Sequence, residues 1–218
     1  MIDAIVFDVG HVLVQGSMLN YMLAELYPSM DLKVLYEPSV IVGASKHQID
    51  KWVEETMSEK IRLLSPRPVS ELIHRSAKVP VTPYAGELLA EASKCGVNVL
   101  CVGAVPGFLT GPLLERLGSN TPFICTYVDI RDDRIADIGP VVTPTRKSHE
   151  VQKWMDSNGS DPARTIIVGD SLGDLEMMKL VPRKNRIAFN ATHDHVVDFC
   201  GCHYANSMGK LLEDVFYG

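Results

Sequence analysis

Three aspartates offer the clearest chemistry in this chain. Asp170 and Asp174 lie four residues apart in the segment Gly-Asp-Ser-Leu-Gly-Asp, residues 169–174, which follows an apolar run at 165–168. Asp8 directly follows another apolar run, residues 4–7, near the opposite end of the chain. Each run is typical of a buried strand. Carboxylates suit a hard cation such as Mg²⁺, and ligands bind at the carboxyl ends of strands in open α/β sheets. The pattern therefore predicts a site that combines a metal with a nucleophile.

The elements that must position these aspartates alternate along the chain. From residue 84 onward, helical segments are predicted at 84–95, 109–117, 149–158 and 175–179. Strands are predicted at 97–102, 123–127, 165–168 and 187–189, and a β-hairpin across 129–142. Such alternation favours a parallel sheet with crossover helices. The fold class predicted is therefore α/β, with a Rossmann-like parallel sheet as its core.

A helical stretch interrupts this pattern directly after the first strand. Apolar residues recur at helical spacing in 18–26 and again in 52–64, and a short helix is predicted at 69–77. Only residues 39–42 in this stretch suggest a strand. We expect an inserted helical cap at 16–78 over a core made of residues 1–15 and 79–218. Insertions of this kind commonly cover a site and exclude water.

Composition narrows the class of protein. The chain has 218 residues, 46% of them hydrophobic, with a net charge of −6 and a pI near 5.6. It contains no basic run, so we expect no nucleic-acid partner. We see neither a signal peptide nor an apolar stretch of spanning length, so we expect a cytoplasmic protein that does not enter a membrane. The five cysteines, an odd number, indicate reduced thiols.

The same residues resemble the haloacid dehalogenase (HAD) superfamily, and within it the phosphoserine-phosphatase-like branch. The resemblance covers most of the chain and rests on four motifs in order. They are the strand ending in Asp8, the strand 99–102 followed by Gly103, Lys147 before a helix, and the segment 169–174. Residues 139–144 and 187–191 also look like that branch, and 16–78 is where the branch has its helical cap.

The resemblance implies a mechanism and a set of roles. Asp8 would attack phosphorus and form an aspartyl-phosphate. Mg²⁺ would bind the carboxylates of Asp8 and Asp170 and the backbone carbonyl of Gly10, while Asp174 would hold a metal-bound water or orient the site. Lys147 would bind the phosphate and stabilise the transferring group. The expected substrate is a small phosphorylated metabolite.

Two positions depart from the family pattern. Gly10 stands where these phosphatases usually have a second Asp that serves as general acid and base. Such a group contributes about 10²–10⁴-fold in rate, although some sugar-phosphate hydrolases of the superfamily also have Gly there. Gly103 replaces the usual Ser or Thr that binds a phosphate oxygen. The backbone N–H groups of Gly103 and Ala104 are the predicted replacement, as an anion-binding nest.

The cap sequence bears on the substrate. Phosphoserine phosphatases use an acidic residue about nine positions after the nucleophile to bind the ammonium group, but residues 16–18 here are Gly, Ser and Met. This argues against phosphoserine. Lys60 and Arg62 lie near the position of the branch's carboxylate-binding Arg, so they are candidate substrate residues, together with His11 and Asn190.

Three alternatives remain open at this level. Gly10 and Gly103 are also compatible with a HAD-fold protein that binds a ligand or partner with little catalysis. A carbon–halogen hydrolase also lacks the second Asp, but it does not need the metal acids that this chain keeps. Finally, Cys200, Cys202 and His203, with two nearby histidines, offer ligand types for zinc at irregular spacing.

Overall fold

A single parallel sheet forms the centre of the molecule. The structure is a computed structural model that describes residues 2–31, 43–191 and 193–218. The strands lie in the order β3-β2-β1-β6-β7-β8, and every neighbouring pair is parallel. Their bounds are β1 Ala4–Asp8, β2 Asn98–Pro106, β3 Phe123–Thr126, β6 Thr165–Gly169, β7 Arg186–Phe189 and β8 Cys202–Tyr204. The strand expected at 39–42 lies outside the described residues.

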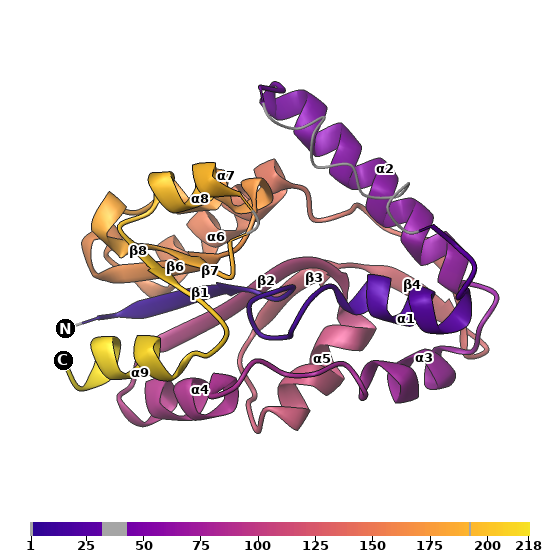
Figure 1. Ribbon diagram of the computed structural model, residues 1–218, viewed down its shortest axis with the longest axis horizontal. Coiled ribbons are helices and arrows are strands. Elements are labelled where there is room, and N and C mark those ends of the chain that lie inside the picture. Colours follow the sequence, from indigo (N-terminus) through magenta and orange to yellow (C-terminus); the bar gives the residue numbers. More distant parts are fainter. Residues whose placement is uncertain (1, 32–42, 192) are drawn as a thin grey trace.

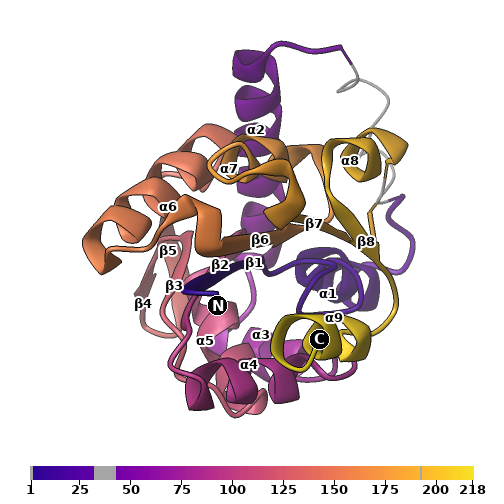
Figure 2. The same ribbon diagram turned by 90° about the vertical axis from the view of Figure 1, so that its left-hand side faces the viewer.

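Helices cover both faces of this sheet (Figure 2), which confirms the predicted α/β class. On one face lie α4 Ala85–Lys94, α5 Gly107–Arg116 and α9 Gly209–Phe216, and on the other α6 Pro144–Asn158, α7 Leu175–Met178 and α8 Asp194–Phe199. Short 3-10 helices occupy Pro162–Arg164, Leu172–Asp174 and Arg183–Asn185. Because successive strand residues point to opposite faces, Ile5 and Phe7 join one buried cluster and Val6 joins the other.

Two element boundaries near the aspartates and one helix at the C-terminal end differ from the sequence prediction. Helix α6 begins at Pro144 rather than His149, with Thr143 as its N-cap, so Lys147 lies inside the first turn and not before the helix. Strand β2 continues to Pro106, where α5 starts at once, so Gly103 and Ala104 belong to the strand. Helix α9 was not predicted; its Leu211 is buried against the core.

The strand order places the two aspartate segments side by side. From β1 the chain builds β2 and β3 on one side, and β6, β7 and β8 on the other. Open α/β sheets bind ligands at such a reversal of strand order. Phe7 pairs with Val168, so Asp8 and Asp170 end adjacent strands at the same edge of the sheet.

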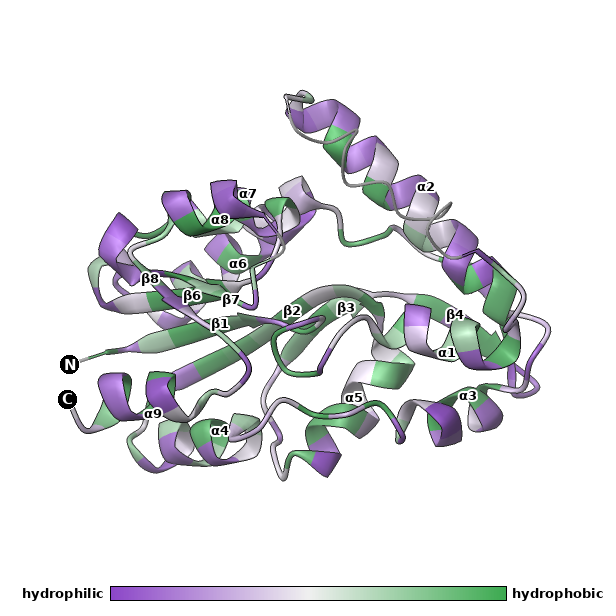
Figure 3. Ribbon diagram, viewed as in Figure 1, coloured by the Kyte–Doolittle hydropathy of each residue, from purple (hydrophilic) through white to green (hydrophobic). Residues whose placement is uncertain are grey.

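Three helices lie beyond the carboxyl ends of the strands (Figure 1). They are α1 Met18–Leu26, α2 Lys46–Leu64 and α3 Val69–Ser76. Figure 3 shows hydrophobic residues concentrated on the central strands, whereas α2 is largely hydrophilic along its length. Near its C-terminal end α2 is nevertheless anchored, because Ile61 and Leu64 are fully buried and the Tyr27 hydroxyl donates to the Leu63 carbonyl at 2.9 Å.

Two adjacent linkers connect these helices to the sheet. Val14 and Val81 form an isolated antiparallel bridge, and the Gln15 N–H donates to the Pro80 carbonyl at 2.8 Å. The Arg116 guanidinium of α5 holds the second linker, since it donates to the Val79 carbonyl at 2.6 Å and also to the carbonyls of Ser76 and Ala77.

The predicted hairpin is present, and it lies beside the three helices beyond the carboxyl ends of the strands. It consists of β4 Val128–Arg131 and β5 Arg134–Ile138, paired antiparallel. Its tip is exposed and also contacts α3: the Asp133 carboxylate accepts from the Ser70 N–H at 2.8 Å and the Ser70 hydroxyl at 2.6 Å. These bonds lower the pKa of Asp133. The cap bounds of 16–78 stay a prediction. The contacts with α3 would group the β4–β5 hairpin with that cap.

Candidate active site

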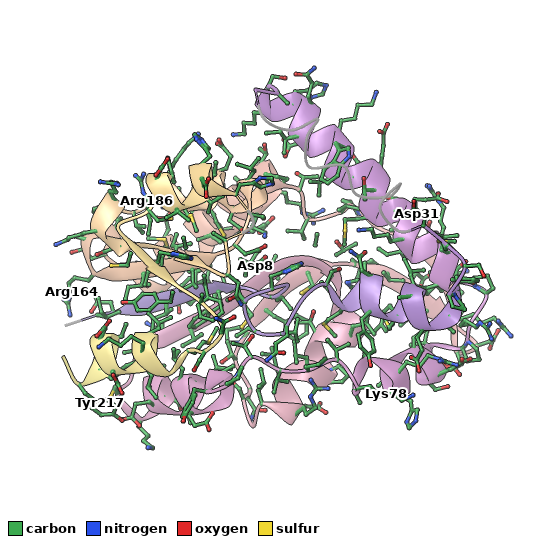
Figure 4. The ribbon with its side chains drawn as sticks, in the orientation of Figure 1. Asp8, Asp31, Lys78, Arg164, Arg186 and Tyr217 are labelled. Atoms are coloured by element: carbon green, nitrogen blue, oxygen red, sulfur yellow. The ribbon has the colours of Figure 1, made fainter. Side chains whose placement is uncertain are left out.

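The three aspartates meet at the carboxyl ends of β1 and β6. Asp8, Asp170 and Asp174 are all buried, and each offers a carboxylate oxygen within 4.8 Å of the others. Figure 4 shows Asp8 near the middle of the molecule, where β1 ends. Within the described part of the chain, this is the only group of three or more His, Cys, Asp or Glu residues arranged to share a metal ion.

Local backbone geometry fixes Asp174. Its Oδ2 accepts from the N–H groups of Asp170 and Ser171, both at 3.1 Å, and from the Ser171 hydroxyl at 3.0 Å. Gly169 permits this arrangement, because a Cβ at residue 169 would lie 2.6 Å from the Asp174 Cβ. The hydrogen bonds leave Asp174 better placed to orient the segment than to turn freely toward a ligand.

Lys147 lies between two of the aspartates. Its Nζ is 2.6 Å from Asp8 Oδ1 and 2.7 Å from Asp174 Oδ1, and the side chain is 8% exposed. Burial opposes the charged form of an ammonium, but Asp174 and Asp8 more than offset it, so the pKa of Lys147 is raised. The neighbouring Arg146 is directed elsewhere and donates to the Pro140 carbonyl at 2.8 Å.

The electrostatics favour a further cation. Burial raises the pKa of Asp8 to about 7; Lys147 opposes this shift, and Asp174 adds to it. Burial also raises the pKa of Asp170 well above its ordinary value, with Asp174 and Asp8 contributing. One ammonium among three carboxylates leaves an excess of negative charge, and clustered oxygen ligands are what Mg²⁺ prefers. The donor set therefore fits a divalent ion.

The two glycines that replace family residues have distinct surroundings. A Cβ at Gly10 would meet only Asp8 Oδ2, at an ordinary 3.8 Å. A Cβ at Gly103 would lie 3.2 Å from both Cβ and Cγ2 of Val9. The β2–β3 register also shifts between Val102 and Pro106, so the ladder is irregular around Ala104.

A cavity of about 170 Å³ opens over the acids and is roofed by α2. Besides Asp8, Gly10, Ala104, Lys147 and Asp170, it is lined by Ile49, Trp52, Val53, Met57 and Lys60 of α2. Sequence reasoning missed the apolar members of this set. Ile49, Trp52, Val53 and Met57 stand at positions i, i+3, i+4 and i+8, and this spacing was the available signal because it places them on one helical face.

Lys60 and His11 give this cavity a basic side. Lys60 is 3% exposed, and burial lowers its pKa to about 8. His11 also lines the cavity, and its pKa is lowered by burial and by Lys60, while Asp174 opposes the shift. His11 adopts a left-handed backbone conformation with φ of 55°, and its N–H donates to the Gly16 carbonyl at 3.0 Å.

Two predicted substrate residues are not brought to this cavity. The Arg62 side chain is 66% exposed, lies 3.7 Å from Glu59, and lines a separate depression with residues 135–141. Asn190 has a bracing position instead, because it donates to the His11 carbonyl at 2.9 Å and accepts from the Asn206 N–H at 2.7 Å.

The cysteine- and histidine-rich C-terminal segment does not form a second centre among the described residues. Cys200 is buried, with its Sγ 3.6 Å from the Met178 sulfur, whereas Cys202 and His203 are exposed. In the described ranges, no helix combines the length and the apolar character needed to cross a membrane.

Comparison with known proteins gives a consistent result. Residues 5–179 match the model of haloacid dehalogenase-like hydrolases. A phosphoserine phosphatase of Archaeoglobus fulgidus is 26% identical over 189 residues, which cover 86% of this chain and 52% of that protein. The chain thus spans about half the length of this curated relative.

Solved structures share the fold. A HAD family hydrolase from Salmonella enterica serovar Typhi superposes with a TM-score of 0.83 and 16% identity, covering 99% of this chain and 72% of that one. A phosphoserine phosphatase described as a phospho-aspartyl intermediate analogue superposes with a TM-score of 0.78 and 19% identity, covering 97% and 98%.

Proposed function

This chain belongs to the haloacid dehalogenase-like hydrolase family, and we propose that it is a Mg²⁺-dependent phosphatase that hydrolyses a small phosphorylated metabolite through an aspartyl-phosphate on Asp8. The observation that supports this most directly is the contact of Lys147 Nζ with Asp8 Oδ1 at 2.6 Å beside Asp170 in one buried cavity. A nucleophile, a cation and a metal-binding acid then face the same small space.

The proposed metal ligands are the carboxylates of Asp8 and Asp170 and the backbone carbonyl of Gly10, with Asp174 orienting the segment. Asp8, Gly10 and Asp170 line one cavity, which supports this assignment. When bound, Mg²⁺ would offset the negative charge of the phosphoryl group.

The side chains of the protein would act in two steps. A carboxylate oxygen of Asp8 attacks phosphorus, the bond from phosphorus to the leaving oxygen breaks, and that oxygen takes the electron pair. Lys147 stabilises the negative charge of the transferring group, helped by the backbone N–H groups near Gly103 and Ala104. A water molecule then attacks the phosphorus of the aspartyl-phosphate and releases inorganic phosphate and the Asp8 carboxylate.

Gly10 limits which esters would react well. Because residue 10 has no carboxylic acid, no side chain at this position can protonate the leaving oxygen. A leaving group of low pKa needs little protonation, so we expect it to be favoured.

The cavity lining supports an anionic substrate without an amino group. Lys60 supplies a buried positive charge, and Trp52 and Met57 supply apolar surface. Among the described lining residues, the only carboxylates are Asp8 and Asp170, which face the proposed phosphate end. Among the residues that the structure describes, an ammonium group at the cap end would therefore find no carboxylate partner. This favours phosphorylated carboxylic acids that lack an amino group over phosphoserine.

The second candidate function is ligand binding with little catalysis. Gly10 and Gly103 favour it, because each replaces a family side chain that contacts the reacting group. Its expected signature is binding of Mg²⁺ and a phosphate analogue without turnover.

Hydrolysis of an activated aryl phosphate separates these two functions. The aryl leaving group needs little protonation, so Gly10 should not hide activity. Turnover that requires Mg²⁺ and is lost in Asp8→Asn would support the phosphatase. Unchanged turnover in Asp8→Asn would exclude Asp8 as the nucleophile, and absent turnover with Mg²⁺ bound would favour the binding protein.

A further inference from the structure

One contact joins α2 to the helix that carries Lys147. Asp50 Oδ1 accepts from the Thr145 N–H at 2.9 Å, and the second Asp50 oxygen accepts from the Thr145 hydroxyl. Both residues are partly buried, although they lie 95 positions apart in the chain. Among the surface ion pairs, Lys46 and Glu176 also link α2 to the sheet side, at 3.1 Å, but Lys46 is half exposed.

The acceptor matches what the N-terminus of α6 lacks. The first N–H groups of a helix have no partner within the helix. Pro144 has no N–H, and Thr143 accepts from the Arg146 N–H, so the Thr145 N–H is the group that Asp50 completes. A carboxylate is also stabilised at this end by the helix dipole. Asp50 therefore acts as an N-terminal cap supplied from a different layer of the protein.

This contact is close to the reacting groups. Lys147 follows Thr145 by two residues in the same helical turn, and its Nζ lies 2.6 Å from Asp8 and 2.7 Å from Asp174. The position of the first turn of α6 thus sets the position of Lys147.

The residues beside this contact also line two cavities. Ile49 and Pro144, the neighbours of Asp50 and Thr145, line both the cavity over the acids and a second one of about 220 Å³. Lys46, Glu176, Lys179 and His195 line the second cavity only. The wall that the two cavities share is therefore built from residues next to this contact.

We propose that Asp50 is a positioning residue that closes α2 over the active site by capping α6, so that closure and the placement of Lys147 against Asp8 occur together. Opening of this contact would admit substrate from the side of the second cavity. The proposal rests on the phosphatase function proposed above, but the contact can be tested without turnover.

Kinetics test the positioning role. Asp50→Ala removes a charge-assisted pair of hydrogen bonds, and we expect kcat/KM for the aryl phosphate to fall by about 10- to 100-fold, mainly in kcat. Asp50→Asn keeps an acceptor oxygen and should retain more activity. Asp50→Ala combined with Thr145→Val should resemble Asp50→Ala alone. Glu55→Ala is the matched control, because it removes one negative charge from the exposed side of the same helix, where Glu55 pairs with Lys51 at 3.8 Å.

Two measurements report the contact without activity. The chain has two tryptophans, so Trp154→Phe leaves Trp52, in the cavity lining, as the only fluorophore of its kind. Asp50→Ala in this background should increase acrylamide quenching of Trp52. Amide hydrogen exchange at Thr145 should also become faster.

The outcomes separate the two proposals. If Asp50→Ala leaves Trp52 quenching and Thr145 exchange unchanged, the closing contact does not exist in solution. If its folded fraction turns over as wild type does while unfolding occurs more readily, Asp50 is merely structural and the positioning role is refuted. If wild type has no turnover at all, the phosphatase fails, while quenching and exchange still decide whether Asp50 holds α2 closed.

Discussion

Replacing Lys147 with methionine tests whether the acid cluster depends on this ammonium for its stability. Methionine keeps the length and the apolar stem of the side chain but removes the charge. Asp8 and Asp174 then lose contacts of 2.6 and 2.7 Å at a position where all three aspartates are buried. Without a metal ion, the three carboxylates of this variant would no longer have the ammonium of residue 147 beside them.

The expected loss is large for one substitution. Removing one partner of a buried ion pair typically costs about 3–5 kcal/mol, because the remaining charge is uncompensated. For a chain of this size, a change of about 1 kcal/mol shifts the melting temperature by about 2–4 °C. We therefore expect Lys147→Met to melt about 6–20 °C below wild type in buffer that contains a chelator.

Mg²⁺ should reverse part of that loss. An ion that binds only the folded state stabilises it by about 2.7 kcal/mol at a hundredfold excess over its dissociation constant. Because Lys147→Met leaves more negative charge for the ion to neutralise, the increase in melting temperature on adding Mg²⁺ should exceed that of wild type. Thermal unfolding followed by circular dichroism, once with a chelator and once with Mg²⁺, measures both the loss in melting temperature and its recovery.

A matched surface variant controls for the loss of a lysine. Lys210 pairs with Asp214 at 2.7 Å but is 65% exposed, so Lys210→Met should change the melting temperature little. Two results would refute this reasoning. One is a Lys147→Met variant whose melting temperature in chelator equals that of wild type. The other is an increase in melting temperature on adding Mg²⁺ that is no larger than that of wild type.

Three further predictions concern the substituted positions and the cap. Gly10→Asp places a carboxyl where space exists, and it should raise turnover of an alkyl phosphate more than that of an aryl phosphate, by up to about 10²–10⁴-fold. Overpacking against Val9 should lower the free energy of unfolding of Gly103→Ser by about 1–3 kcal/mol, which appears as a lower urea midpoint, and Val9→Ala should restore part of it. Binding of an anionic substrate should weaken as pH rises through about 8, where Lys60 loses its proton; in Lys60→Met, KM should be high and without this inflection.

Each has an outcome that contradicts it. Equal gains on both phosphates would show that Gly10→Asp supplies no proton to the leaving group. An unchanged midpoint in Gly103→Ser would mean that Val9 yields space freely. A KM inflection near pH 8 that persists in Lys60→Met would assign the titration to a group other than Lys60.

The fold and the acid cluster were predictable because strand ends fix positions. An aspartate that closes an apolar strand must lie at the sheet edge, and adjacent parallel strands bring Asp8 and Asp170 together. The start of α6 was placed five residues too late, although Thr143 followed by Pro144 is a typical helix start.

The cap residues were not predictable to the same degree. Successive helical residues differ by about 100°, so Lys60 and Arg62 face nearly opposite directions, and only the packing of Ile61 and Leu64 decides which one meets the cavity. The contact of Asp50 with Thr145 depends on how two layers meet, which no local pattern in either segment specifies.

Helix α2 is attached at two points that lie far apart along its axis. Its C-terminal end is held by Tyr27 on Leu63, and the Asp50 contact lies thirteen residues earlier, about 20 Å away along the helix axis. A rotation of about 10° around the Leu63 end would move Asp50 by about 3.5 Å, which exceeds hydrogen-bond reach. A small tilt at the anchored end would thus break the Asp50 contact completely without unfolding any part of the helix.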